Sequence, residues 1–164
     1  RLENAAVSSI VDPDAAAACV KAGVGATLTL DIGGRIDPRF GAPVRATGTV
    51  THVADGRFTI QGPMMTGMKI DLGPTATFKV GGVEIVLATN RFQNYDLGFF
   101  RIGGIEPTER AVLGLKSMQH FRAAYAPIAS EIVVVDEGNG CCSQRLDMLT
   151  FRNVRRPVFP LDLT

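Results

Sequence analysis

The sequence lacks long apolar runs and lacks a charge imbalance. No stretch of its 164 residues approaches the roughly 20 consecutive apolar residues that a membrane-spanning helix needs. It has 17 lysines and arginines against 16 acidic residues, a net charge of +1, so no long-range field draws nucleic acid or anionic lipid to the chain. We therefore expect neither a membrane nor a nucleic acid among its partners.

Histidine is scarce, which bears on metal binding. The two histidines, His52 and His120, stand 68 positions apart, and no acidic or cysteine pair shows the short spacing of a zinc site. The sequence therefore predicts no metal or other cofactor in this chain. It also lacks a G-x-S-x-G nucleophile turn, a P-loop and a G-x-G-x-x-G unit, so its glycine pairs are interpreted as turns.

Cysteine is scarce too, and the three present make poor disulfide partners. Cys141 and Cys142 are adjacent, and a bond across the roughly 3.8 Å between neighbouring Cα atoms would be strained. Cys19 fits a small buried position in a helix. An odd count of free thiols indicates a reducing, cytoplasmic compartment. A redox pair or two free loop thiols at 141 and 142 both stay open.

The start of the sequence, RLENAAVSSI, has neither an initiator methionine nor the layout of a signal peptide. We expect the chain to be a piece of a longer protein. No repeat, low-complexity tract or long linker divides it, so residues 1–164 are predicted to form one domain.

The clearest local signals are one helix and one hairpin. Asp12 and Pro13 supply an N-cap and a first-turn proline, and Gly23 a stop, which predicts a helix over residues 12–22. The alternating runs 75–80 and 83–88 around Gly81-Gly82 predict a β-hairpin.

Further elements follow from weaker patterns. Strands are predicted over residues 6–11, 26–32, 111–115 and 128–135, a second hairpin over residues 44–60, and helices near residues 96–103 and 117–125. The tail from residue 138 is expected to be extended and loop-rich. Together these patterns predict an α+β fold with a mixed, mainly antiparallel sheet of six to eight strands and two to four helices.

The densest polar cluster is KSMQHFR, at the junction of a predicted strand and helix. Lys116, Ser117, His120 and Arg122 could together hold a carboxylate or phosphate. In the alternative interpretation Ser117 only caps the helix, while His120 packs inward.

A second cluster lies in TNRFQNYD after the hairpin. Asn90, Arg91 and Asp96 are candidate contact residues there, and the alternative is that they only cap loops. Asp96 could also begin a short helix.

Several segments together resemble, in the same order, the C-terminal domain of the microcystinase C family of bacterial metallopeptidases. The likeness runs from about residue 5 to residue 162. It includes VDPDAAAACVKAGVGATLTLDIGG, GPMMTGMKIDLGPTA and KVGGVEIVLAT. Its most specific parts are K-S-x-x-H-F-R-A at residues 116–123 and R-R-P-x-x-P-L-D at residues 155–162.

The resemblance implies a division of labour. In that family the hydrolytic zinc is held by histidine and acidic side chains of a larger N-terminal domain, which this sequence does not contain. The chain would be the non-catalytic C-terminal domain of a zinc metallopeptidase-like hydrolase, inactive by itself. It would pack on the N-terminal domain and line a cleft for a peptide-like substrate. Lys116, Ser117, His120, Phe121 and Arg122 match the family pattern and become the best candidates for contact with substrate or catalytic domain.

Two alternatives stay open. The chain could be a self-sufficient module that binds a small anion through Lys116, His120 and Arg122, or that forms homo-oligomers. It could also be a metal-independent enzyme with a nucleophilic Cys141 or Cys142. The accessory-domain interpretation predicts an exposed apolar docking surface, with Phe92, Phe99 or Phe100 in it.

Overall fold

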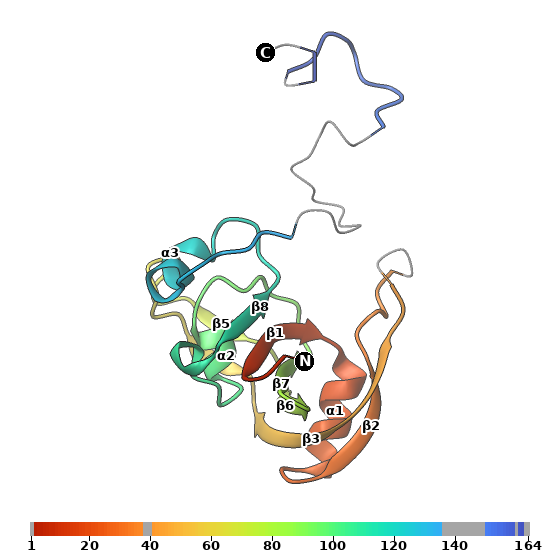
Figure 1. Ribbon diagram of the computed structural model, residues 1–164, viewed down its shortest axis with the longest axis vertical. Helices are drawn as coiled ribbons and strands as arrows, with labels where there is room; N and C mark the ends of the chain where they lie inside the picture. The colour runs from red at the N-terminus through yellow and green to blue at the C-terminus, as the bar shows by residue number, and fades with distance from the viewer. Residues whose placement is uncertain (1, 38–40, 136–149, 160, 163–164) are drawn as a thin grey trace. The chain divides into compact units, whose positions relative to one another are not determined.

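The computed structural model describes residues 2–37, 41–135, 150–159 and 161–162. The chain divides into two compact units, residues 1–131 and residues 132–164, which are treated separately. The first unit carries these elements in chain order (Figure 1): β1 (Ala5–Val11), α1 (Pro13–Ala22), β2 (Thr27–Ile32), β3 (Val44–Ala54), β4 (Arg57–Thr59), β5 (Lys69–Asp71), β6 (Thr75–Val80), β7 (Val83–Ala88), α2 (Gly98–Arg101), the 3-10 helix η2 (Pro107–Glu109), β8 (Val112–Leu115), α3 (Arg122–Tyr125) and the 3-10 helix η3 (Ala126–Ile128).

The main sheet has six strands in the order β2-β3-β6-β7-β1-β8. The pairs β2–β3, β3–β6 and β6–β7 are antiparallel, whereas β1 runs parallel to both β7 and β8. The predicted α+β class and mixed, mainly antiparallel sheet are confirmed, and the three α-helices among the described residues lie within the predicted range.

α1 forms where the capping signals predict it. The Asp12 carboxylate accepts the Ala15 amide at 3.1 Å, Pro13 opens the helix, and the Gly23 amide donates to the Cys19 carbonyl at 3.0 Å. Ala15 and Cys19 are buried against the sheet, because small side chains let the helix lie close to it. Burial raises the pKa of the Cys19 thiol to about 11.

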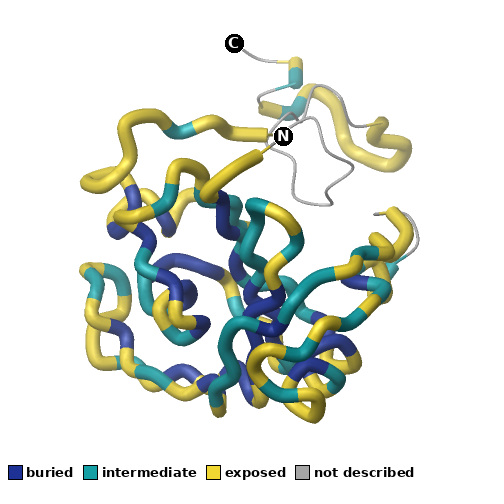
Figure 2. Tube along the Cα trace, turned by 60° about the horizontal axis from the view of Figure 1, so that its bottom comes forward, coloured by how far each residue is buried: buried dark blue, intermediate teal, exposed yellow. Residues whose placement is uncertain are grey.

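The β6–β7 hairpin has the predicted register, with Ala76 opposite Leu87, Phe78 opposite Ile85 and Val80 opposite Val83. This face of the sheet packs on α1, and the core runs through the middle of the unit (Figure 2). The alternating positions face the other way, since side chains on a strand change sides at each residue.

α2 covers that second face, on the opposite side of β1 from α1 (Figure 1). The Thr77 hydroxyl donates to the Gly103 carbonyl at 2.7 Å, and the Ser8 hydroxyl to the Phe99 carbonyl at 2.7 Å. Phe99 and Phe100 are fully buried here. The expectation that these two phenylalanines form an exposed docking patch is therefore wrong, because both side chains pack in the hydrophobic core.

The predicted hairpin over residues 44–60 is wrong, although both of its strands exist. The end of β3 that precedes β4, residues 49–54, pairs with β6 instead of with β4. β4 pairs with β5 in a separate two-stranded sheet, and Gly56 lies so close to Gly73 that an added Cβ would overlap the Gly73 carbonyl oxygen.

Two later predictions also need correction. The helix expected over residues 117–125 begins only at Arg122, because Ser117 is engaged by another side chain instead of capping a helix. The strand expected over residues 128–135 does not form; Val133, Val134 and Val135 are exposed. A short apolar run shows the composition of a buried strand but not whether a pairing partner exists.

The second unit has neither helix nor strand among its described residues 132–135, 150–159 and 161–162. Within it Arg156 pairs with Asp162 at 2.6 Å, and the Val158 amide donates to the other carboxylate oxygen at 2.7 Å. The arginine and aspartate of the R-R-P-x-x-P-L-D segment thus close a turn. Cys141 and Cys142, and the tail expected from residue 138 as far as residue 149, lie outside the described residues.

Candidate functional site

The three parallel strands end at one edge of the sheet, and both polar clusters of the sequence follow them there. β7 is followed by residues 89–97 and β8 by residues 116–121, while β1 between them is followed by Asp12. The Asp12 amide donates to the Ala88 carbonyl at 3.0 Å, which joins the ends of β1 and β7.

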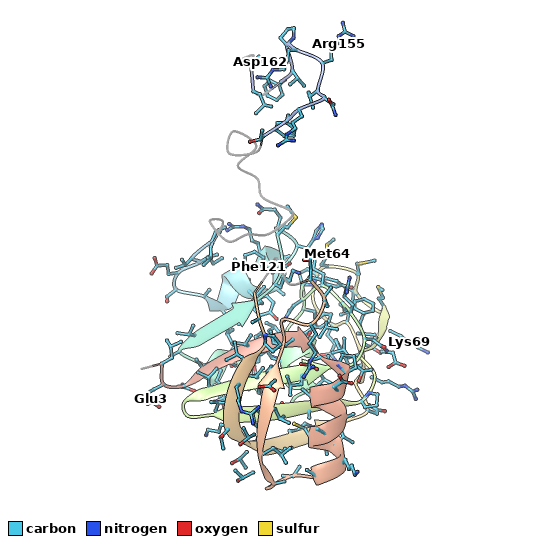
Figure 3. All side chains as sticks on the ribbon, turned by 90° about the vertical axis from the view of Figure 1, so that its right-hand side faces the viewer. Glu3, Met64, Lys69, Phe121, Arg155 and Asp162 are labelled. Carbon is cyan, nitrogen blue, oxygen red and sulfur yellow. The ribbon has the colours of Figure 1, made fainter. Side chains whose placement is uncertain are left out.

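The connections that leave this edge go to opposite faces of the sheet. The chain after β1 enters α1 on one face, and the chain after β7 leads to α2 on the other. Neighbouring parallel strands with oppositely directed connections leave a crevice outside their carboxyl ends, where open α/β sheets bind ligands. We call residues 89–97 and 116–125 the carboxyl-edge loops. In Figure 3 Phe121 lies near the top of this unit, whereas Glu3, which precedes β1, lies at its left-hand side.

One glutamine joins the two predicted clusters. The Gln93 side-chain amide nitrogen donates to the Ser117 hydroxyl at 2.9 Å and lies 3.3 Å from His120 Nδ1. These three residues, from two segments far apart in the sequence, form the Gln93 cluster. Gln93 and His120 are exposed and Ser117 is half-buried, so the cluster faces solvent.

Arg122 and Lys116 do not join this cluster through a shared partner. The Arg122 guanidinium donates to the Gln119 side-chain oxygen at 3.0 Å and lies 5.4 Å from the centre of the Phe121 ring. Lys116 is exposed, and its side chain makes no hydrogen bond or ion pair with the described residues. The convergence of Lys116, His120 and Arg122 on one pocket, which the anion-binding module needs, is not seen in the described part of the chain.

Asn90 and Asp96 take the loop-capping roles that were the alternative. The Asn90 side chain donates to the Asp71 carbonyl at 3.1 Å. The Asp96 carboxylate is buried and accepts the amides of Gly62 and Gly98, each at 2.7 Å. It therefore supports the start of α2, as the sequence indicated. Arg91 is exposed.

Asn94, next to Gln93 in the chain, belongs to a buried polar network that the sequence analysis did not predict. The Tyr125 hydroxyl lies 2.6 Å from the Asn94 side-chain oxygen and 2.9 Å from the Asp96 carbonyl. The Asn94 amide donates to the Ser8 carbonyl at 3.2 Å. Burial, with a further contribution from the Asp96 charge, raises the pKa of Tyr125. This network fixes both carboxyl-edge loops to the centre of β1.

A cavity of about 620 Å³ opens beside the network, within the size range of small-molecule sites. Its walls include Phe58, Gly62, Asp96, Arg101, Ala124 and Pro127. Arg101 is already paired with Glu106 through two bonds of 2.9 and 3.1 Å, and this arginine lowers the pKa of Glu106 to about 2. The main charged groups of the cavity are therefore occupied by protein partners.

Sequence reasoning had little chance of finding Gln93, Asn94 and Tyr125. Glutamine and asparagine are common in loops and do not by themselves indicate a functional site. Tyr125 lies near the end of a predicted helix, where nothing in the sequence distinguishes it. The only available signal was position, because Gln93 and Asn94 lie between the candidates Arg91 and Asp96.

The described residues do not fit a zinc site. They contain no group of three or more histidine, cysteine or acidic side chains that could hold a metal ion. His52 lies in β3 beside Gly104, whereas His120 contacts Gln93. A search of the same residues for helices long and apolar enough to cross a membrane found none.

Comparison with known proteins matches the family described as MlrC C-terminus to residues 1–153. Microcystinase C of Sphingomonas sp. is 25% identical over 156 residues, which cover 95% of this chain and 29% of that protein. A crystal structure described as a "Putative metallopeptidase" from Mesorhizobium sp. BNC1 is 26% identical, with a TM-score of 0.78 over 97% of this chain and 31% of that one. The chain thus spans about three tenths of the length of each relative. The sequence match over nearly its whole length shows that the chain belongs to the MlrC C-terminus family.

Proposed function

We propose that this chain is the non-catalytic C-terminal domain of a bacterial, cytoplasmic zinc metallopeptidase-like hydrolase. In this proposal it packs on a metal-bearing N-terminal domain of the same protein and lines one wall of the cleft for a peptide-like substrate. The zinc ligands would come from that other domain, and no catalytic step is assigned to residues of this chain.

The observation that carries the proposal is the pattern of coverage. Nearly all of this chain aligns with less than a third of a protein described as a metallopeptidase, with the fold retained at a TM-score of 0.78. The same fraction recurs in Microcystinase C. A chain that corresponds to less than a third of a metallopeptidase-like protein can be an accessory domain of it. The reaction depends on particular residues, which can lie in the other two thirds.

The carboxyl-edge loops are the face that we assign to the cleft. They carry exposed polar side chains on a rigid support, because the Tyr125 network ties them to β1. Met118 on these loops is 49% exposed, and Met65 in the loop between β4 and β5 is 53% exposed. Such flexible apolar side chains suit contact with another protein surface.

Hydrogen–deuterium exchange tests this assignment. The full-length product of the gene that encodes this sequence is compared with residues 1–164 alone. We expect slower exchange in residues 89–97 and 116–125 of the longer protein, because the other domain covers them. Slower exchange confined to β2, at the far edge of the sheet, would contradict the assigned face.

A further inference from the structure

The Gln93 cluster has a defined hydrogen-bonding direction. An amide nitrogen can only donate, so the Ser117 hydroxyl oxygen and His120 Nδ1 both act as acceptors toward Gln93. A neutral imidazole that accepts at Nδ1 carries its hydrogen on Nε2. The Ser117 hydroxyl likewise keeps its own hydrogen for another partner.

Both of these hydrogens are available to a ligand. Among the residues that the structure describes, no acceptor receives the Ser117 hydroxyl hydrogen or the His120 Nε2 hydrogen. The cluster is exposed, so a molecule in solution can reach it. The site therefore presents two unused donors, the Ser117 hydroxyl and His120 Nε2, and suits a ligand that accepts hydrogen bonds.

The charged residues of the two segments that form the cluster have the sign that an anion requires. Residues 89–95 and 116–125 contain Arg91, Lys116 and Arg122 but no aspartate or glutamate. The nearest acidic residue along the chain, Asp96, is buried and turned toward the amides of Gly62 and Gly98. A carboxylate has two oxygens that accept hydrogen bonds, so it can use the two donors of Ser117 and His120.

We propose that Ser117 and His120, held by Gln93, bind a carboxylate group of a peptide, at its C-terminus or on an acidic side chain. The peptide identity rests on the proposed function, whereas carboxylate binding is a property of this chain alone. Gln93 is the positioning residue and fixes the direction of both hydrogen bonds.

Nuclear magnetic resonance titration of the ¹⁵N-labelled chain tests the proposal. The probes are N-acetylglycine for a C-terminal carboxylate, N-acetylglutamate α-amide for a side-chain carboxylate, and the neutral N-acetylglycinamide as control. We expect at least one acid to shift the signals of Ser117 and His120, and the neutral amide to leave them unchanged. The ¹⁵N shifts of the His120 ring should show the neutral form protonated at Nε2.

Two variants with the same charge change separate the site from general electrostatics. Gln93→Glu replaces the donor with an acceptor, so the dissociation constant for the bound acid should rise at least about tenfold. Gln119→Glu adds the same charge beside Arg122, outside the cluster, and should change that constant less than about threefold.

Each result has a distinct meaning. Equal effects of the acids and the amide, no shift with either acid, or equal loss in both variants would overturn the carboxylate site. Carboxylate binding by the chain, with no peptide hydrolysis by the full-length gene product, would support the site and contradict the proposed function. Peptide hydrolysis by the full-length gene product, with no carboxylate binding by the chain, would contradict the site and support the proposed function.

Discussion

At the residue scale, Tyr125 is the side chain on which the candidate site most depends. Its hydroxyl reaches both Asn94 and Asp96, and Asn94 continues to Ser8 at the centre of the sheet. Its ring packs edge-on against the Phe100 ring, with 6.1 Å between the two ring centres. A single residue late in the chain therefore links α3, the loop after β7 and β1.

Replacing Tyr125 with phenylalanine should destabilise the fold. The change leaves the buried Asn94 oxygen without its donor, which costs about 1–3 kcal/mol of unfolding free energy. Tyr95→Phe is the matched control, because among the described residues the Tyr95 hydroxyl has only the Met68 sulfur, at 3.7 Å, as its hydrogen-bond partner, and it should cost under about 1 kcal/mol. Urea denaturation measures both; equal losses would mean that the Asn94 bond contributes nothing.

The pH dependence of stability offers a second check on Tyr125. Its pKa in the folded chain is raised above the ordinary value of 10.0, so folding favours the protonated phenol. This contribution is present below pH 10 and is lost as the pH rises above it. The stability gap between the natural chain and Tyr125→Phe should therefore narrow from about pH 8 to about pH 11. A constant gap would show that the phenol titrates normally.

The sequence singled out Ser117 and His120 as candidates, but not Gln93, which joins them. Both clusters were predicted from polar side chains after strands, and both lie at the carboxyl edge. That Asn90 and Asp96 cap loops while Gln93 joins Ser117 to His120 depends on contacts across 19 or more positions of the chain. Such contacts have no periodicity for a pattern to show.

At the element scale, local sequence signals predicted where helices and strands form better than they predicted which strands pair. The β6–β7 hairpin and α1 were predicted because turn, cap and alternation lie within a few residues of one another. The predicted partner of β4 was wrong because strand pairing depends on strands farther along the chain, here β6 for β3 and β5 for β4. Exposure of residues 133–135 could not be predicted for the same reason.

The close approach of Gly56 to Gly73 makes the β4–β5 pairing testable. In Gly56→Ala the new Cβ would overlap the Gly73 carbonyl oxygen, and φ is +80° there. Gly81→Ala has a similar φ of +58° but open space around the Cβ, so it should cost about 1–2 kcal/mol. Gly56→Ala should cost about 1–3 kcal/mol more. Equal thermal denaturation losses would contradict this close packing.

At the scale of the whole molecule, the family match and the structural match both align this chain with one part of longer proteins. A six-stranded mixed sheet, covered by α1 on one face and α2 on the other, supports a polar edge with a donor cluster. One domain over residues 1–164 stays a prediction, and the second unit contributes at least one closed turn of its own. The two relatives are about three times as long as this chain. In the proposed function, the additional part is the domain that this edge would face.

The most direct test of the accessory-domain account is zinc content measured together with hydrolysis of a simple peptide. Both are determined for residues 1–164 and for the full-length gene product, with and without added zinc. The account predicts bound zinc and zinc-dependent hydrolysis in the full-length protein, and neither in the chain alone. Stoichiometric zinc with activity in residues 1–164, or inactivity of the zinc-loaded full-length protein, would contradict it.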